Sequence, residues 1–135
     1  MAKQFTLGKT ERLKSRKQID HLFKAGKSFT VFPFKIYYRL DSTSGDAELK
    51  FGVGAGTRNF KKAADRNRIK RLTREAWRLQ NTVLKQKLIT GSKKLNVFFI
   101  YTGKELPDFT LVKDKVALAL KKMIGLVDES PAADT

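Results

Sequence analysis

The feature that most constrains the fold is a segment from about Lys62 to about Leu88 with the apolar spacing of one long helix. On a helical wheel of about 100° per residue, its apolar side chains fall within about 220–300° of Arg66, and they are Ile69, Leu72, Ala76, Leu79 and Val83. The basic side chains fall opposite, at about 40–140°, and they are Lys70, Arg71, Arg74 and Arg78. We therefore predict that this helix packs its apolar stripe on a sheet and turns the basic stripe outward.

The remaining segments supply that sheet and further helices. Ser15 and Gln18 form a capping box, which predicts a short helix over 15–25 that ends at Gly26. Alternating apolar residues predict two strands, over 34–40 and 48–55, that pair as an antiparallel hairpin, and 27–31 is expected to add a short strand. The apolar run 95–101 predicts a buried strand. A last helix is expected from a Thr110 cap, with an apolar stripe of Val112, Val116, Leu120 and Met123.

This order of elements indicates an α+β fold in which helices pack on one sheet. We expect a single domain over residues 1–125, because neither a repeat nor a linker interrupts the chain. Residues 1–14 are expected to form a basic extended arm. Residues 126–135 are acidic, small and contain a proline, and they are expected to be disordered.

The charge balance points to a polyanionic partner. Lys and Arg number 29 against 13 Asp and Glu, a net charge of +16, and such an excess repels itself in the compact state. Nucleic acid is the first candidate partner and an anionic membrane surface the second. The absence of cysteine excludes disulfides and fits a cytoplasmic protein. The longest apolar run, Val97–Tyr101, is too short to span a membrane.

The basic stripe favours nucleic acid because solvated helix faces usually mix charges of both signs. Arginine predominates on it, and the guanidinium offers five donors in a planar fork that matches phosphate oxygens. Asn67 lies within the stripe between Arg66 and Arg68, and its amide can both donate and accept a hydrogen bond. Trp77 lies at the edge of the stripe and is expected to cover the flank of the helix. Lys93 and Lys94 are expected to be ordinary solvated charges.

These residues carry a family resemblance. The stretch FKKAADRNRIKRLTREAWR resembles the signature of the protein subunit of bacterial ribonuclease P, in which an Arg-Asn-Arg motif opens a long helix. ERLKSRKQIDHLFKAGKSF is similar to that family's first helix and following loop, and FGVGAGTRNF stands where the family has the strand before the motif. The resemblance covers roughly residues 10–122. It implies an α-β-β-β-α-β-α sandwich with a four-stranded mixed sheet and a left-handed βαβ crossover.

The resemblance also implies a role for the basic stripe in binding the family's catalytic RNA subunit. The RNA-binding residues expected on this basis lie on the long helix or just before it, and they are Arg58, Lys61, Lys62, Arg66, Asn67, Arg68, Lys70, Arg71 and Arg74. The family usually has serine where Gly52, Gly54 and Gly56 stand. On a strand, glycines two residues apart lie on one face and permit close approach of another group.

A second surface is predicted from Lys35, Tyr37 and Arg39, which point away from the apolar face of their strand. From the pattern alone this face is either a nucleic-acid-binding sheet surface or a second small core under the first helix. The resemblance implies a cleft for the single-stranded 5′ leader of precursor tRNA. Its residues are expected to be Ile19, Phe23, Lys35, Tyr37 and Arg39, with Ile19 standing where many relatives carry phenylalanine.

The chain offers no set of residues for catalysis of its own. It has one histidine, no cysteine and no cluster of carboxylates, so we predict neither a catalytic residue nor a metal site. The resemblance implies that the active site and Mg²⁺ belong to the RNA subunit and that the protein assists removal of the 5′ leader from precursor tRNA. Two alternatives remain: a ribosomal-type structural protein that binds rRNA, and a membrane-surface protein.

Overall fold

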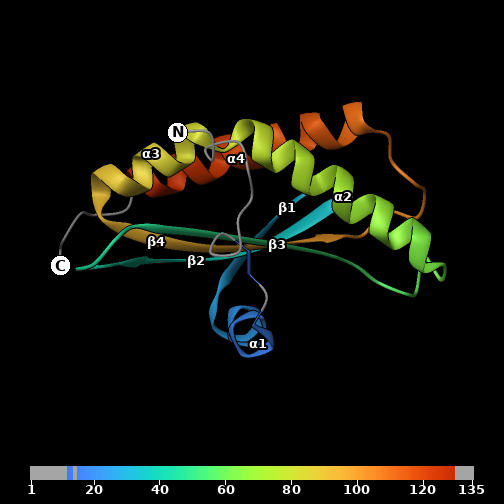
Figure 1. Ribbon diagram of the computed structural model, residues 1–135, viewed down its shortest axis with the longest axis horizontal. Helices are drawn as coiled ribbons and strands as arrows, with labels where there is room; N and C mark the ends of the chain where they lie inside the picture. The colour runs from blue at the N-terminus through green and yellow to red at the C-terminus, as the bar shows by residue number, and fades with distance from the viewer. Residues whose placement is uncertain (1–11, 14, 130–135) are drawn as a thin grey trace.

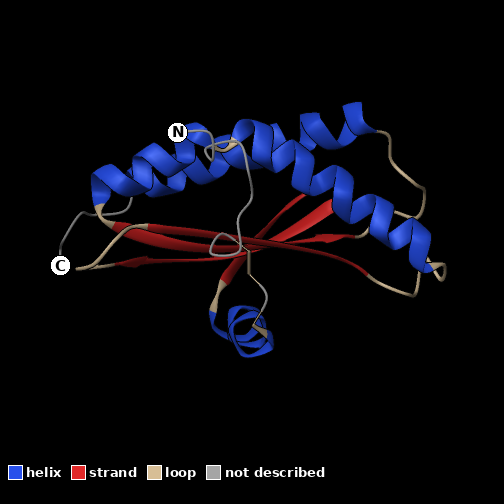
Figure 2. Ribbon diagram, in the orientation of Figure 1, coloured by secondary structure: helices blue, strands red, loops and turns tan. Residues whose placement is uncertain are grey.

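Three helices cover one face of a four-stranded sheet, and a fourth helix lies alone on the opposite face (Figures 1 and 2). The computed structural model describes residues 12–13 and 15–129. The elements in chain order are α1 (Arg16–Ala25), β1 (Lys27–Val31), β2 (Phe34–Ser42), β3 (Glu48–Ala55), α2 (Ala63–Gln80), α3 (Thr82–Gly91), β4 (Lys93–Tyr101) and α4 (Phe109–Glu129). The predicted α+β fold with a mixed sheet is confirmed.

The strand order is β1-β2-β4-β3, which corrects one predicted pairing. β2 and β3 run in opposite directions but are not neighbours, because β4 lies between them, antiparallel to β2 and parallel to β3. The apolar run of β4 is typical of such a central strand, which other elements cover on both faces. The short strand β1 is present and pairs antiparallel with β2. The hand of the β3–β4 crossover stays a prediction from the resemblance.

The main core lies between the sheet and helices α2, α3 and α4. Every second residue of β2, β3 and β4 points into it, including Phe34, Phe51 and Phe99. The predicted stripe of α4 is fully buried there. Trp77 is buried as well, and its ring stacks on Phe51 at 4.3 Å between centroids and 12° between planes. The prediction that Trp77 covers the helix flank is therefore wrong.

The long helix predicted over 62–88 is two helices that meet at Asn81. Asn, Thr and Val follow one another at this point, and all three lower helix propensity. The buried face of α2 is turned toward Trp77 relative to the predicted stripe, so it contains Ile69, Thr73, Ala76 and Trp77. Leu79 of α2 and Val83 of α3, which the pattern assigns to the core, are both exposed.

Helix α1 begins as predicted, with the Ser15 hydroxyl accepting a hydrogen bond from the backbone N–H of Gln18. It ends at Gly26, whose φ of −81° any residue could adopt. The reason for glycine is close packing instead. A Cβ at this position would lie 2.5 Å from the carbonyl oxygen of Leu22 and 2.8 Å from that of Tyr38, so the glycine lets α1 turn directly into β1 beside β2.

Both ends of α4 differ from the prediction. The carboxylate of Asp108, rather than Thr110, accepts a hydrogen bond from the N–H of Leu111 at 2.9 Å and caps the helix. The helix continues to Glu129, so residues 126–129 are not disordered, and residues 130–135 lie outside the described residues. Lys93 is buried rather than solvated, and its Nζ donates to the carbonyl of Val127 near the end of α4.

Little of the predicted basic arm lies within the described residues, which include only Arg12 and Leu13 of it. Arg12 forms a parallel bridge with Phe51 of β3, and the N–H of Leu13 donates to the carbonyl of Phe51 at 2.9 Å. Leu13 is buried. This short stretch therefore extends the sheet beside β3.

Candidate nucleic-acid interface

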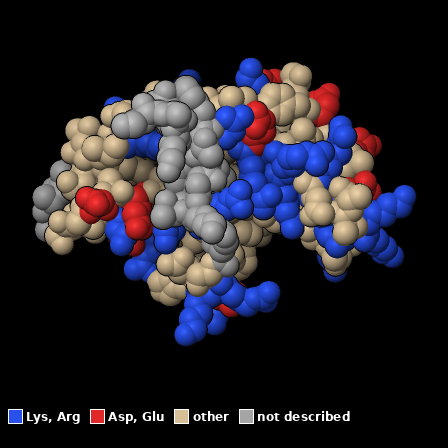
Figure 3. Space-filling view, viewed as in Figure 1, with Lys and Arg blue, Asp and Glu red and all other residues tan. Residues whose placement is uncertain are grey.

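The predicted basic face of α2 is exposed. Asn67, Arg68, Arg71 and Arg74 are exposed and Lys70 is half-buried, while Arg58, Lys61 and Lys62 are exposed in the loop before the helix. Figure 3 shows Lys and Arg side chains gathered over the part of the molecule where α2 lies. The sequence therefore placed these cations on one surface correctly, although the buried face of the helix differs from the predicted one.

Arg66 differs from its neighbours because its guanidinium is engaged within the protein. Its Nη1 donates to the carbonyl oxygens of Phe60 and Lys61, at 2.8 Å each. These bonds tie the first turn of α2 to the loop before it. Arg78 is similarly engaged, with Glu75 one turn earlier on the helix. Within residues 12–13 and 15–129, Arg68, Arg71 and Arg74 form no hydrogen bond or ion pair with the protein, so these exposed cations are better placed to meet an external anion.

Arg12 adds a charge to this surface that sequence reasoning did not include. Residues bridged across strands point their side chains to the same side of the sheet, so Arg12 lies on the α2 side, as Phe51 does. Burial, and then the charge of Arg12, lower the pKa of Arg74 from its ordinary value. The proximity of these two cations could not be read from sequence, because it depends on the pairing of the arm with β3.

On the other face of the sheet, α1 stands over an aromatic cluster. The ring of Phe23 lies 4.8 Å from Tyr37 and 5.6 Å from Phe98 between centroids. Phe23 is 39% exposed and Tyr37 is half-buried. Ile19 lies one turn before Phe23 on α1, so the two share a helix face. The Nζ of Lys35 lies 5.3 Å from the centre of the Tyr37 ring.

Phe98 belongs to this cluster, and sequence reasoning missed it. The register places Tyr37, Phe98 and Gly52 in one row across β2, β4 and β3. A Cβ at Gly52 would lie 2.7 Å from the Phe98 ring, and one at Gly54 would lie 3.3 Å from it. The glycines of β3 therefore make room for the ring, which confirms the predicted close approach. The unbroken apolar run of β4 concealed that Phe98 faces α1 rather than the main core.

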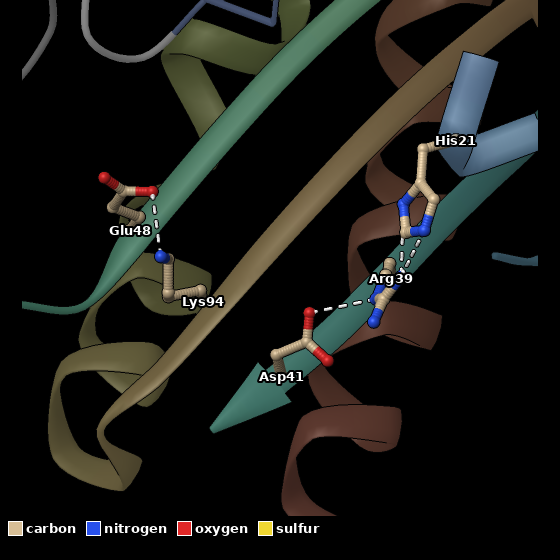
Figure 4. A network of polar contacts seen from close by, with 5 residues as sticks. All are labelled: His21, Arg39, Asp41, Glu48 and Lys94. Atoms are coloured by element: carbon tan, nitrogen blue, oxygen red, sulfur yellow. Dashed lines mark hydrogen bonds and ion pairs between the residues drawn. The ribbon is translucent and has the colours of Figure 1, made fainter. Parts of the chain in front are cut away.

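Arg39 lies farther along the same face and is already engaged. Its Nε donates to Asp41 at 3.0 Å, and its Nη1 lies 3.0 Å from Nε2 and 3.1 Å from Nδ1 of His21 on α1 (Figure 4). Because arginine can only donate, it requires an acceptor nitrogen on the histidine. A second ion pair, Lys94–Glu48 at 4.0 Å, joins β4 to β3. Arg39 thus ties α1 to β2.

Residues 12–13 and 15–129 contain no group of three or more His, Cys, Asp or Glu residues that could hold a metal ion. Across that same part of the chain, no helix has the length and apolarity needed to cross a membrane.

Comparison with known proteins identifies the family of this chain. The family Ribonuclease P matches residues 7–124. The chain belongs to the ribonuclease P protein family. A ribonuclease P protein component from Porphyromonas gingivalis is 36% identical over 126 residues, which cover 93% of this chain and 92% of that protein. One from Thermotoga maritima is 31% identical over 128 residues and is covered completely.

Solved structures of the ribonuclease P family share the fold. The Thermotoga maritima ribonuclease P protein has a TM-score of 0.64 and 27% identity, with 83% of this chain and 96% of that one covered. The Staphylococcus aureus protein has a TM-score of 0.62 at 20% identity, with 85% and 96% covered. The predicted family resemblance is confirmed by these matches.

Family membership gives the chain its role. It is the RNA-binding accessory subunit of ribonuclease P, the endoribonuclease of tRNA 5′ maturation, whose catalytic RNA is the partner. The ribosomal-type alternative is not favoured. Ribonuclease P generally acts with divalent metal ions.

Proposed function

We propose that the exposed basic face of α2 binds the catalytic RNA of ribonuclease P and that the cleft under α1 holds the 5′ leader of precursor tRNA. The observation that carries this proposal is the separation of the two surfaces. Three helices bury one face of the sheet and present cations outward, whereas the opposite face keeps an aromatic cluster half-open beside a single helix. One protein can therefore contact two RNAs at once.

On the α2 face, the contacts are phosphate contacts made by Arg68, Arg71 and Arg74, supported by Lys70 and by Arg58, Lys61 and Lys62 in the preceding loop. Planar guanidinium groups bind phosphate oxygens with two donors at once. Arg66 positions the start of α2 through its bonds to Phe60 and Lys61, and its other donors remain available for RNA. Asn67, exposed between two arginines, is suited to a 2′-hydroxyl or a base edge.

In the cleft, the leader is held by stacking and by charge. Unpaired bases stack on aromatic side chains without strong sequence preference. Phe23 and Tyr37, with Phe98 below them, provide the aromatic surface. Lys35 and Arg39 place cations along β2 for the leader's phosphates. Ile19, which stands where many relatives carry phenylalanine, offers an apolar contact instead of a stacking ring.

In this proposal, Mg²⁺ belongs to the catalytic RNA. Two polyanions repel one another, and Mg²⁺ offsets that repulsion when protein is absent. The cations of this chain, part of a net charge of +16, lower the same repulsion. The protein is thus expected to matter most at low Mg²⁺.

The test is reconstitution with a bacterial ribonuclease P RNA and precursor tRNA. We expect the protein to restore cleavage at low Mg²⁺ and Arg68→Ala/Arg71→Ala to weaken binding to the catalytic RNA. Because each neutralised phosphate releases counterions, the slope of log affinity against log salt should flatten by about one to two units in that variant. Lys121→Ala/Lys122→Ala, on exposed positions of α4, is the matched control. An unchanged slope in the arginine variant refutes the assignment of this face.

A further inference from the structure

The turn between β1 and β2 exposes an aromatic side chain that neither proposed surface uses. Phe32 is 69% exposed, the largest fraction among the large apolar side chains of residues 12–13 and 15–129. Exposing a phenylalanine forgoes the burial that normally stabilises a large apolar side chain. An isolated exposed apolar residue requires no explanation, but Phe32 is not isolated.

Phe32 lines a hollow of about 550 Å³ at one end of the sheet. Its apolar wall includes Leu106 and Leu111, which are both exposed, and its cations are Lys104 and Lys115. Glu105 is the one acidic residue among the described residues that line it. A hollow of this volume is within the range that holds small ligands, roughly 300–1,000 Å³.

The turn is held firmly enough to present the ring in a fixed place. Both the backbone N–H and the hydroxyl of Thr102 donate to the carbonyl of Pro33, at 2.7 and 3.0 Å. The hydroxyl of Tyr101 donates to the carbonyl of Glu105 at 2.7 Å, which fixes the loop that carries Lys104. The wall of the hollow is therefore held by hydrogen bonds that join the β1–β2 turn and β4 to the β4–α4 loop.

This hollow adjoins the basic surface of α2 and not the cleft under α1. The side-chain amide of Asn59 donates to the carbonyl oxygens of Thr102 and Gly103, at 3.4 and 3.2 Å. The loop that carries Arg58 and Lys61 is thereby joined to the loop that carries Lys104. Figure 1 shows the start of α2 and the β4–α4 connection at the same end of the molecule. The ring of Tyr101 packs against Phe34 and Phe60, on the side of the sheet that α2 and α4 cover.

We propose that this hollow binds one unpaired nucleotide of the catalytic RNA, with its base stacked on Phe32 and its phosphate near Lys104. The inference rests on the proposed function, in which the neighbouring α2 face binds that RNA. The chemistry fits because an aromatic face beside lysine ammonium groups is how proteins hold single nucleotides without reading their sequence. Two lysines and one glutamate line the hollow, so its charge favours an occupant that carries a phosphate. An apolar peptide without acidic residues is disfavoured for the same reason.

The test compares Phe32→Ala with Phe32→Trp for affinity to the ribonuclease P RNA at one salt concentration, using the full chain. Base–aromatic stacking predicts about five- to a hundred-fold weaker binding for the alanine variant, with affinity retained by the tryptophan variant. Ile89→Ala is the matched control, because Ile89 is 60% exposed on α3 and does not line the hollow. Chemical probing of the RNA should show one unpaired nucleotide that becomes more reactive only in Phe32→Ala.

Four outcomes separate the possibilities. Wild-type affinity in Phe32→Ala, while Arg68→Ala/Arg71→Ala binds weakly, overturns this inference and leaves the proposed function standing. Wild-type affinity in both variants overturns the proposed function as well. Loss of precursor tRNA affinity alone in Phe32→Ala shows that the nucleotide comes from the substrate, and overturns the assignment to the catalytic RNA. Loss that tryptophan does not restore points to a structural role and also overturns it, and thermal melting of each variant checks folding.

Discussion

Gly52→Ala is predicted to destabilise the protein by forcing apart the contact between β3 and the Phe98 ring. The added Cβ would lie 2.7 and 2.8 Å from two ring carbons of Phe98 and 3.0 Å from the carbonyl oxygen of Leu13. Non-bonded carbons are most favourable at about 3.5–4.0 Å, so the ring must move by about 1 Å. It cannot do so freely, because Phe23 packs on its other side, with 5.6 Å between centroids.

The expected cost is about 1–3 kcal/mol, the usual range for overpacking. For a chain of 135 residues this corresponds to a melting temperature lower by about 3–15 °C. Two glycines of the same segment serve as graded controls. Gly54→Ala brings a Cβ to 3.3 Å from the ring and should be nearly neutral, whereas Gly56→Ala meets only Arg58 N at 4.0 Å. Gly56→Ala should therefore gain about 0.4–1 kcal/mol from the reduced freedom of the unfolded chain.

Thermal unfolding followed by circular dichroism checks the order of the three variants. If Gly52→Ala melts at or above the wild-type temperature, the Phe98 ring is not held against β3 and the packing described for the cleft is wrong. Affinity for precursor tRNA with a leader provides a second readout, since a displaced Phe98 changes the floor of the cleft. Affinity for the catalytic RNA should remain at the wild-type value, because Gly52 faces away from α2.

Three further variants test other parts of the structure. Tyr37→Ala should weaken binding of precursor tRNA by assembled holoenzyme about five- to a hundred-fold, while mature tRNA, which lacks a leader, binds as before; equal weakening of both would indicate that Tyr37 only packs under α1. Asn67→Ala should reduce activity at limiting protein and low Mg²⁺ without a change in melting temperature, because Asn67 is exposed, and full activity would contradict its role. Burial, and then the charge of Glu105, raise the pKa of Tyr101, so the folded state holds this proton more tightly than the unfolded state. The resulting stability is complete below the unfolded pKa of about 10 and is lost as pH rises through the folded pKa. Tyr101→Phe should therefore lose less stability than the wild type as the pH rises above about 10, and identical pH profiles would contradict this effect of the Tyr101 proton.

The sequence predicted best what depends on local pattern. Strand alternation placed Lys35, Tyr37 and Arg39 on the open face, and the capping box at Ser15 located the start of α1. Features that depend on contacts between distant segments were missed. The insertion of β4 between β2 and β3 is one, because hairpin pairing is the default for two consecutive strands and no local signal marks an exception.

The same limit explains the errors at the two surfaces. A helical wheel assumes one straight helix, so it missed the break at Asn81. It also could not show that the buried face of α2 is turned so that Trp77 lies in the core and Leu79 is exposed. Charge counting could not show that Arg66 bonds to two carbonyl oxygens of its own loop. An unbroken apolar run is found both in strands buried on two faces and in strands buried on one, so Phe98 could not be assigned to the aromatic cluster under α1 before the position of that helix was known.

The division of the sheet into a fully covered face and a half-open one explains how this chain can expose aromatic rings and still fold. The helical layer already buries Phe34, Phe51, Phe99 and Trp77, which form one connected aromatic core. Because that face supplies the apolar burial, the opposite face can be covered by a single ten-residue helix. The exposed cations of α2 cost folding free energy through mutual repulsion, and the same core offsets that cost. RNA binding then relieves the repulsion, so assembly with the catalytic RNA should stabilise the protein through the charges that destabilise it alone.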